Sequence, residues 1–390
     1  MKALLAAYGT RGDTEPFAAV GRELLRRGHD VCIAVAPEMV GFLESAGLDA
    51  VPFGPESLAS ARSRMIHDSV SGVVDEKEYL SRAMEEWGTA LTALANGADL
   101  LITGRIEQGL AANVAEYYGI PQAALHFFPG AHSRLSGWAG DTMDEAEDAH
   151  RRALGRADAT GPSTRCLEIQ AYDALCFPEL ADEWADADSR RPFVGALTLE
   201  LPTEADDDVV SWIAAGTPPI YVGFGSGVWL PHPAQTFGLI GVACSRLGER
   251  ALICSGASHF VGVPHSDQVK VVGAVNHAAV FPACRAVVHQ GGAGTTAAGM
   301  RAGIPTLILW HPINDQEIWA GAVERLKVGS GRAFSASNLG SLVADLRSIL
   351  DPQCVTRARE VGAQMTKPAV SVASAADLLE DAGRLGRVSD

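Results

Sequence analysis

The sequence predicts an α/β protein with two Rossmann-like domains that face a cleft. From Lys2 to Gly130, apolar segments of strand length alternate with amphipathic segments of helical period. A second series of the same kind starts at Pro218, after an irregular stretch rich in Asp, Ala and Arg. Alternating strands and helices form parallel sheets covered by helices, so each series should fold as one domain.

The first domain should begin with the strand Lys2–Tyr8, a Gly-rich turn and a helix from about Pro16 to Gly28. Pro suits the first turn of a helix and Gly suits its end, which is why we place the helix between them. The remaining elements of this domain continue the alternation. They are strands at 31–36, 49–52, 99–104 and 121–128, and helices at 37–46 and 107–118.

The second domain should contain strands near 218–225, 251–254, 269–272, 286–289 and 306–310. We place the two domains at residues 1–202 and 203–370, with a C-terminal helix at 371–390 that packs back on the first domain. Ligands of open parallel sheets bind outside the carboxyl ends of the strands. The loops at Gly9, Gly225 and Gln290 should therefore face the cleft.

The composition is that of a globular protein with 390 residues, 47% of them hydrophobic, which is enough for two cores. A formal net charge of −16 argues against nucleic acid as a partner, because that affinity depends on Lys and Arg neutralising phosphates. The 7 cysteines form no C-x-x-C pair and should be reduced. No apolar run approaches the ~20 residues of a membrane span, and the apolar start is too short for a signal peptide. We expect a cytoplasmic protein without integral membrane contact.

The clearest motif is the glycine-rich segment AVVHQGGAGTTAAGMRAGIP at 286–305. A strand ending at His289 leads into Gly291, Gly292 and Gly294, and a helix of small residues follows. Glycines let the backbone approach a ligand closely, and the free N–H groups and positive dipole of a helix start suit a diphosphate. His289 can donate a further hydrogen bond to a phosphate oxygen. The alternative interpretation is a tight turn beside a core histidine.

A dinucleotide site is a second interpretation of the same segment. Residues 292–297 satisfy the G-x-G-x-x-A fingerprint, and Asp315 follows about 20 residues later. The acidic residue of such folds closes the next strand, whereas Asp315 follows the strand 306–310 only after a His-Pro-Ile-Asn loop. The position of Asp315 therefore argues against NAD.

Several segments, taken in order, resemble the antibiotic and glycolipid glycosyltransferases of actinobacteria, which belong to the UDP-glycosyltransferase family. They are YGTRGDTEPFAAVGRELLRRGHDV, PPIYVGFGS, VVGAVNHAAVFPACRAVVHQGGAGTT, RAGIPTLILW and the Asp-Gln pair of NDQEIWA. The resemblance spans nearly the whole chain. It implies the GT-B architecture, with an acceptor-binding first domain and a nucleotide-sugar-binding second domain. It also implies a metal-independent hexosyltransferase of natural-product biosynthesis that needs no cofactor beyond its nucleotide-sugar co-substrate.

The resemblance implies a donor site made mainly by the second domain. Asp315 and Gln316 would hydrogen-bond the sugar, although Asp315 or Asn314 could instead cap a helix, and the backbone at Val275 would read the pyrimidine. Ala257 stands where many relatives have a tryptophan that stacks on the base, so the choice between dTDP and UDP stays open. The other residues implied for donor binding are Arg11, Gly12, Ser226, His289, Gly292, Ala293, Gly294 and Thr295.

Asp13 is the candidate general base of an inverting displacement, in which a carboxylate takes the proton of the attacking acceptor hydroxyl. The aspartate lies in the GTRGD loop and matches the proposed base of similar enzymes. We expect Arg11 to lower its pKa if the two are close. Asp13 could instead only cap the helix near Pro16, and His126 is the alternative base.

The acceptor is expected to be a hydrophobic polyketide, macrolide, peptide antibiotic or glycolipid. Its pocket would be lined by Trp87, His126, Phe127, Phe128 and Trp138, although these aromatic side chains could equally be core residues. The oligomeric state, the sugar and the choice between O- and C-glycosylation stay open. No metal site is expected, because the D-x-D pattern at 206–208 precedes a helix, where acidic residues are common.

Three other functional classes remain as alternatives at this point. A nucleotide-sugar 2-epimerase has the same two-domain architecture but needs no hydrophobic acceptor. An NAD-dependent dehydrogenase would use the glycine-rich segment as a dinucleotide fingerprint. A catalytically silent partner of another glycosyltransferase would lack the phosphate-binding residues, which this chain retains.

Overall fold

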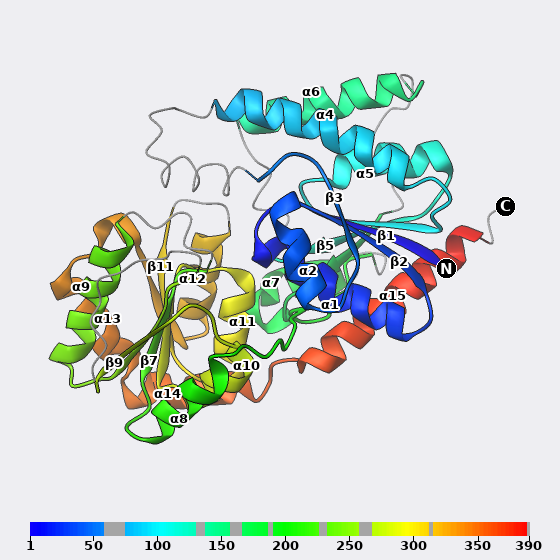
Figure 1. Cartoon of the computed structure of the whole chain (residues 1–390). Helices are drawn as coiled ribbons and strands as arrows, with labels where there is room; N and C mark the ends of the chain where they lie inside the picture. The colour runs from blue at the N-terminus through cyan, green and yellow to red at the C-terminus, as the bar shows by residue number, and fades with distance from the viewer. Residues whose placement is uncertain are drawn as a thin grey trace. The chain divides into compact units, whose positions relative to one another are not determined.

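The computed structural model describes residues 1–57, 75–129, 137–156, 166–185, 190–225, 232–256, 267–311 and 315–387. The chain divides into two compact units, which Figure 1 shows as separate α/β assemblies. The N-terminal unit comprises Met1–Ala174, Pro178–Leu199 and Pro368–Asp390, and the C-terminal unit comprises Leu175–Phe177 and Glu200–Lys367. The main boundary lies between Leu199 and Glu200, beside the position expected from the sequence.

The N-terminal unit is built on one parallel sheet with the strand order β3-β2-β1-β4-β5-β6. Residues on β1 pair with both neighbours, as Leu4 does with Cys32 on one side and Leu101 on the other. The strands are β1 (Lys2–Ala7), β2 (Asp30–Val35), β3 (Ala50–Pro52), β4 (Leu100–Gly104), β5 (Gln122–His126) and β6 (Leu167–Gln170).

Helices cover both faces of this sheet (Figure 1). Side chains of α4 and α5 pack with Leu4, Ala34 and Leu101 in one buried apolar cluster, and α6 lies against α4. Helix α1 packs on β2 and also on α15. The helices of this unit are α1 (Arg11–Arg26), α2 (Val40–Ser45), α4 (Glu76–Leu94), α5 (Gln108–Tyr118), α6 (Trp138–Ala153), α7 (Pro178–Ala185) and α15 (Pro368–Arg387).

The C-terminal helix α15 is held to the segment between α1 and β2 by charged side chains. Arg27 donates a hydrogen bond of 2.6 Å to Asp377, and His29 Nε2 lies 2.7 Å from a carboxylate oxygen of Glu380. These contacts attach the end of the chain to the N-terminal unit.

Helix α1 begins at Arg11, earlier than the predicted start near Pro16. Thr10 occupies the N-cap position, and its backbone N–H donates a 2.7 Å hydrogen bond to the Asp13 carboxylate, which is one half of a capping box. This bond stabilises the turn that the sequence analysis assigned to a loop. Pro16 therefore lies inside the helix, and Asp13 lies in its first turn rather than before it.

The C-terminal unit repeats the architecture with a sheet of order β12-β11-β10-β7-β8-β9. Its strands are β7 (Ile220–Gly223), β8 (Ala251–Cys254), β9 (Val269–Val272), β10 (Ala286–His289), β11 (Thr306–Trp310) and β12 (Gly329–Ala333). Its helices are α8 (Asp206–Ala214), α9 (Pro233–Arg246), α10 (His277–Val280), α11 (Ala293–Arg301), α12 (Gln316–Arg325), α13 (Leu339–Ile349) and α14 (Pro352–Gly362).

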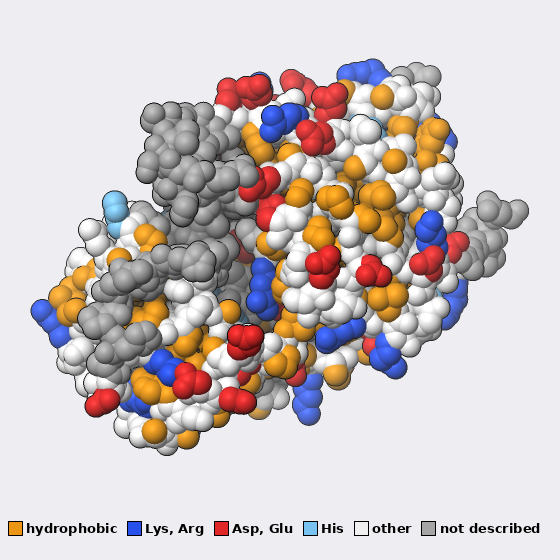
Figure 2. All heavy atoms as spheres, viewed as in Figure 1, with side chains coloured by type: hydrophobic (Ala, Val, Ile, Leu, Met, Phe, Trp, Pro, Cys, Tyr) orange, Lys and Arg blue, Asp and Glu red, His pale blue; other side chains and the backbone are white. Residues whose placement is uncertain are grey.

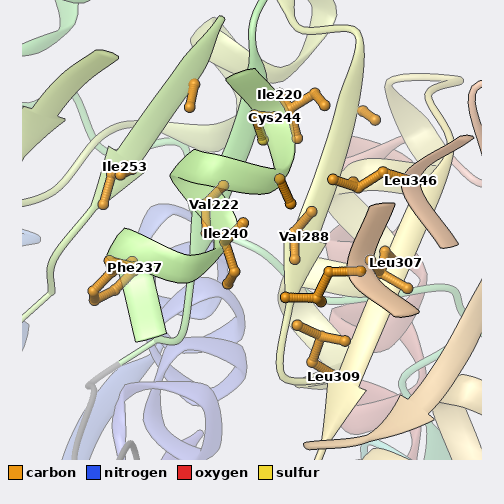
Figure 3. Packing of buried hydrophobic residues seen from close by; sticks show 14 of the residues in the cluster. Ile220, Val222, Phe237, Ile240, Cys244, Ile253, Val288, Leu307, Leu309 and Leu346 are labelled. Carbon is orange, nitrogen blue, oxygen red and sulfur yellow. The ribbon is translucent and has the colours of Figure 1, made fainter. Parts of the chain in front are cut away.

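Two apolar clusters fill the two sides of this second sheet. Figure 3 shows one of them, in which Val222 of β7 and Leu307 of β11 face Phe237 and Ile240 of α9 and Leu346 of α13. The other cluster joins side chains of β7, β8 and β10, among them Tyr221, Leu252 and Val287, to α8 and α10. Strands buried on both faces read as continuous apolar runs, which is why β7, β10 and β11 were recognisable in the sequence.

Both sheets have the order 3-2-1-4-5-6 when the strands of each unit are numbered in chain order. In this order the chain direction across the sheet reverses between the first and fourth strands. The switch points are therefore at the carboxyl ends of β1 and β4 and of β7 and β10. Two parallel doubly wound sheets confirm the predicted fold class.

The surface shown in Figure 2 carries acidic and basic side chains interspersed with small hydrophobic groups. On this face, the Lys and Arg side chains drawn in blue form no broad basic region of the kind that nucleic acid binding requires. Among the residues that the structure describes, no helix has the length and apolar character needed to cross a bilayer.

Candidate functional site

The glycine-rich turn lies at the switch point of the C-terminal unit. Strand β10 ends at His289, and Gly291 turns the chain with a φ of +102°. A Cβ on Gly291 would lie 2.8 Å from Ile308 Cγ2 and 3.0 Å from the backbone oxygen of Gln316. Only glycine combines this backbone conformation with such close packing. The turn therefore holds the start of α11 against the start of α12.

His289 is fully buried at the end of β10. Its Nδ1 accepts a 3.0 Å hydrogen bond from the Gly291 N–H, so in the neutral ring Nε2 carries the proton. Burial lowers the pKa of His289 to about 3, which keeps the ring neutral. Nε2 is buried and has no hydrogen-bond partner within the described residues. The ring thus offers one unused N–H donor.

The first turn of α11 adds backbone donors beside His289. Gly292 is the N-cap residue, and Ala293, Gly294 and Thr295 form the first turn, whose N–H groups have no intrahelical acceptor. This turn contains no acidic side chain. Free N–H groups and the positive end of the helix dipole make it a suitable site for an anion.

Gln290 and Gly225 bring the loops after β10 and β7 together. A Cβ on Gly225 would lie 2.7 Å from Gln290 Nε2, and the Oε1 atom of Gln290 is buried with no partner among the described residues. Gly225 has a φ of +62°, which favours glycine. The predicted loops at Gly225 and Gln290 therefore meet at one switch point, whereas Ser226 and Ala257 lie outside the described residues.

Asp315 and Gln316 lie at the start of α12. Gln316 is buried, and its Oε1 accepts a 2.9 Å hydrogen bond from the His311 backbone N–H. Asp315 is the N-cap residue, but its side chain forms no capping hydrogen bond. The capping role considered for Asp315 is thus not what its side chain does.

Val275 lies in the core of the C-terminal unit with 7% of its surface exposed. The following residue, Asn276, donates its backbone N–H to Asp206 at 2.8 Å. Asp206 also accepts hydrogen bonds from the backbone N–H and hydroxyl of Thr203, and Asp208 forms a 2.7 Å ion pair with Lys270. The D-x-D pattern therefore stabilises the start of α8 and the neighbouring turn. Within the described residues, no group of three His, Cys, Asp or Glu side chains is placed to bind a metal.

Asp13 lies at the switch point of the N-terminal unit, in the loop and helix start after β1. Its Oδ2 accepts hydrogen bonds from the Thr10 N–H at 2.7 Å and the Thr10 hydroxyl at 3.0 Å. Asp13 is partly exposed as a residue, but burial of its carboxyl group raises its pKa, with the Thr10 hydrogen bonds opposing that rise. A raised pKa makes this carboxylate a stronger base than an ordinary aspartate.

The condition under which Arg11 would lower the pKa of Asp13 is not met, because Arg11 pairs with another carboxylate. Arg11 forms a 2.9 Å ion pair with Glu15, one helical turn away, and its guanidinium lies 4.8 Å from the centre of the Phe42 ring. Helical geometry brings residues i and i+4 together on one face, so Arg11 pairs with Glu15 rather than with Asp13. Gly12, the other predicted contact of this turn, is exposed.

Glu107 is a site residue that the sequence analysis did not identify. It directly precedes α5 in the loop after β4, which is the other strand of the N-terminal switch point, and only 2% of its surface is exposed. Burial raises the pKa of Glu107 to about 8, and the nearby charge of Asp13 acts in the same direction. The signal that could have found it is its position, since both carboxyl groups follow the strands that flank the reversal of chain direction.

The predicted acceptor residues separate into core and non-core positions. Trp87 is 2% exposed and packs in the core between Tyr8 and Phe53, with ring centroids at 4.5 Å and 6.3 Å. Its burial is that of a core residue, which is the alternative that the sequence left open, because the apolar face of α4 packs against the sheet. Phe127 and Phe128 follow β5 and are partly buried.

The remaining aromatic candidates differ in their exposure. Phe127 contacts Phe17 of α1 edge to face, at a centroid distance of 6.1 Å, and Phe128 lies under the Arg105 guanidinium. Trp138 is exposed at the start of α6. His126 is buried at the end of β5.

Replacing Gly291 by alanine should destabilise the protein by about 1–3 kcal/mol, because the new Cβ meets the backbone of Gln316 at a positive φ. Gly321→Ala is the matched control. Gly321 lies inside α12 with open space around its Cα, so alanine should stabilise by about 0.5–1 kcal/mol. Urea unfolding measures both values, and equal effects of the two substitutions would contradict the close packing at Gly291.

Glu107→Gln should change how stability depends on pH. The native carboxyl, with a pKa of about 8 against an ordinary value of 4.5, holds a proton that the unfolded chain releases. Its contribution to stability is fully present below the unfolded pKa and is lost as pH rises through the folded pKa. As pH rises from the ordinary pKa to the native one, the melting temperature of the wild type should therefore decrease relative to that of the variant. A difference that does not change with pH would refute the raised pKa of Glu107.

Two sequence families match the chain. Residues 3–93 match the glycosyltransferase family 28 N-terminal domain, and residues 255–382 match the erythromycin biosynthesis protein CIII-like C-terminal domain. The first match lies within the N-terminal unit, and the second covers most of the C-terminal unit and continues into α15 of the N-terminal unit.

Similar proteins are found among the glycosyltransferases of actinobacteria. An uncharacterized glycosyltransferase of Mycobacterium tuberculosis is 54% identical, over 99% of this chain and 100% of that protein. The vancomycin aglycone glucosyltransferase of Amycolatopsis orientalis is 29% identical over 98% of each chain. The crystal structure of the Streptomyces sp. SF2575 glycosyltransferase SsfS6, complexed with thymidine diphosphate, has the same fold, with a TM-score of 0.64 and 22% identity over 98% of this chain and 99% of that one. The chain therefore belongs to the family of actinobacterial glycosyltransferases that includes the antibiotic glycosyltransferases.

Proposed function

We propose that this glycosyltransferase transfers a hexose or deoxyhexose, with inversion, from a dTDP- or UDP-sugar to a hydroxyl of a hydrophobic natural product or glycolipid. The observation that carries the proposal is the buried Nε2–H donor of His289, which has no partner among the described residues and lies beside the free N–H groups of α11. A neutral histidine and a helix start with no acidic residue suit a diphosphate. A nucleotide diphosphate is also what the SsfS6 structure contains.

The proposed donor site stabilises the leaving group without a metal ion. As the bond between the anomeric carbon and the β-phosphate oxygen breaks, the electron pair and its negative charge move onto the diphosphate. N–H donors that are already oriented toward that charge lower the barrier. In this proposal His289, Gly292, Ala293, Gly294 and Thr295 hold the diphosphate. Ser226, Val275, Asp315 and Gln316 keep the donor-binding roles implied by the family resemblance, as do Arg11 and Gly12 of the first loop.

Asp13 is the proposed general base. The acceptor oxygen forms a bond to the anomeric carbon on the face opposite the phosphate, and its proton moves to the Asp13 carboxylate. The raised pKa of Asp13 brings it closer to the pKa range of an efficient base at neutral pH. The capping hydrogen bonds from Thr10 fix the carboxylate, so one residue both stabilises α1 and accepts the proton.

The proposed acceptor side of the enzyme is the region after β5, with His126, Phe127 and Phe128. The vancomycin aglycone glucosyltransferase supports a large natural product as acceptor, since its name gives such a substrate. We also propose that the enzyme acts in the cytoplasm, where nucleotide sugars are made.

The dinucleotide alternative is disfavoured by the order of the strands. A Rossmann fingerprint occupies the turn after the first strand of its domain. The glycine-rich turn of this chain follows β10, the fourth strand of its unit. Asp315, the proposed ribose-binding acid, starts α12 instead of ending a strand. The 2-epimerase alternative has no support from the relatives described above.

Asp13→Asn should abolish transfer while nucleotide binding stays near normal. Asparagine keeps an oxygen that can accept the Thr10 N–H, so α1 should still form, but its amide cannot take a proton. We expect kcat to fall by a factor of about 10²–10⁴. Transfer to an acceptor and the affinity for dTDP or UDP are measured in parallel. Unchanged turnover would remove Asp13 from the mechanism.

His289→Asn should weaken nucleotide binding more than it weakens the fold. Its amide oxygen can replace Nδ1 as acceptor for the Gly291 N–H, but no group of asparagine reaches the position of Nε2. The Kd for dTDP or UDP should rise about tenfold, as for the loss of one hydrogen bond to a charged group. Calorimetry measures the affinities, and melting curves with dTDP, UDP and NAD test the ligand class. Stabilisation by NAD alone would overturn the proposed donor site.

A further inference from the structure

His126 lies at the end of a chain of hydrogen bonds inside the N-terminal unit. Its Nε2 is 2.9 Å from Gln108 Oε1 at the start of α5. The amide Nε2 of Gln108 donates a 2.9 Å hydrogen bond to Glu168 Oε1 on β6, and Arg191 Nε binds the second oxygen of Glu168 at 2.7 Å. Gln108 is held from a second side, because Gln122 donates 2.8 Å to its backbone oxygen.

The direction of each hydrogen bond in this chain is determined by its charged end. Glu168 is ionised, because its hydrogen bonds with Gln108 and its pairing with Arg191 outweigh burial and lower its pKa. An ionised carboxylate only accepts hydrogen bonds. Gln108 must therefore turn its NH₂ group toward Glu168 and its oxygen toward His126. Since an amide oxygen cannot donate, His126 must carry its proton on Nε2.

The consequence is a free lone pair on the other ring nitrogen of His126. Burial lowers the pKa of His126 to about 4, so the ring is neutral and Nδ1 is unprotonated at neutral pH. Within the part of the chain that the structure describes, Nδ1 forms no hydrogen bond, although only 5% of the residue surface is exposed. This lone pair is therefore available to a molecule bound at the same edge of the sheet.

The position of this atom indicates what its partner is. His126 is the last residue of β5, so it lies at the carboxyl edge where ligands of parallel sheets bind. The two partly buried aromatic residues Phe127 and Phe128 follow it directly. A lone-pair acceptor beside aromatic surface suits a hydroxyl carried on an apolar molecule.

We propose that the Gln108–Glu168–Arg191 chain fixes His126 in the Nε2–H tautomer so that Nδ1 accepts a hydrogen bond from a hydroxyl group of the acceptor substrate. This inference rests on the proposed glycosyl transfer and adds a positioning residue to it. His126 selects and orients a hydroxyl-bearing acceptor, while Asp13 takes the proton. Arg191 and Glu168 act only through Gln108 and do not touch the substrate.

The tautomer is tested first, without any substrate. Long-range ¹H–¹⁵N spectra of protein labelled at its 11 histidines distinguish Nε2–H from Nδ1–H rings, and the signal absent from His126→Gln assigns the residue. We expect the Nε2–H form at neutral pH in the wild type, and a mixture of tautomers in Gln108→Leu. An Nδ1–H or a charged ring in the wild type would overturn the proposal, whatever reaction the enzyme catalyses.

Two variants of His126 test the substrate contact with a defined probe. Asparagine places its amide oxygen near Nδ1 but does not reach Gln108. Glutamine places its amide group at the Nε2 position and keeps the hydrogen bond to Gln108, but it has no acceptor at the Nδ1 position. The probes are 4-methylumbelliferone, a phenol, and its methyl ether, which lacks the hydroxyl hydrogen. Binding of each is measured by titration in the absence of any donor, so the result does not depend on transfer.

The wild type and His126→Asn should bind the phenol about tenfold more tightly than the ether, as one hydrogen bond predicts. His126→Gln should bind the phenol and the ether equally. It should have a higher melting temperature than His126→Asn, because it keeps the hydrogen bond to Gln108. A purely structural His126 predicts that His126→Gln behaves like the wild type in both measurements. That outcome, or the absence of any preference for the phenol in the wild type, would overturn the proposal.

Discussion

At Gly291 the backbone turns with a φ of +102°, and Ile308 and the backbone of Gln316 occupy the space that a Cβ would need. This close packing links three parts of the C-terminal unit. It places the Gly291 N–H on His289 Nδ1, it starts α11 with its first N–H groups unpaired, and it holds α12 next to the turn. A side chain at this position would separate all three. The candidate diphosphate site therefore depends on one steric condition at one residue.

The two units use the same strand order for different chemistry. In the N-terminal unit the switch point carries the carboxyl groups of Asp13 and Glu107, whereas in the C-terminal unit it carries the N–H donors of His289 and α11. A carboxylate with a raised pKa suits the acceptance of a proton, and neutral N–H donors suit a phosphate. The shared topology supplies the location in each case, and the side chains decide the chemistry.

Burial controls the protonation of the groups in these sites. It raises the pKa of Asp13 and Glu107 and lowers the pKa of His126 and His289, so each group shifts toward its neutral form. For the two histidines a neighbouring hydrogen bond then selects one tautomer. Gly291 leaves the proton of His289 on Nε2 as a donor, and Gln108 leaves Nδ1 of His126 as an acceptor. One histidine is thus left as a donor and the other as an acceptor, because the protein hydrogen-bonds Nδ1 in the first and Nε2 in the second.

The sequence by itself determined the α/β class, the two series of strands and helices, and the glycine-rich turn, because buried parallel strands are continuous apolar runs and a positive φ requires glycine. The order of the motifs also identified the family, which the relatives confirm. Only the tertiary structure decided which polar groups meet. Arg11 pairs with Glu15 because α1 begins before Asp13, and Trp87 is buried because α4 covers the sheet. Glu107 approaches Asp13 from the loop after β4, and Glu168 of β6 is linked to His126 through Gln108. Such pairings depend on strand order and helix start positions, which local sequence patterns do not encode.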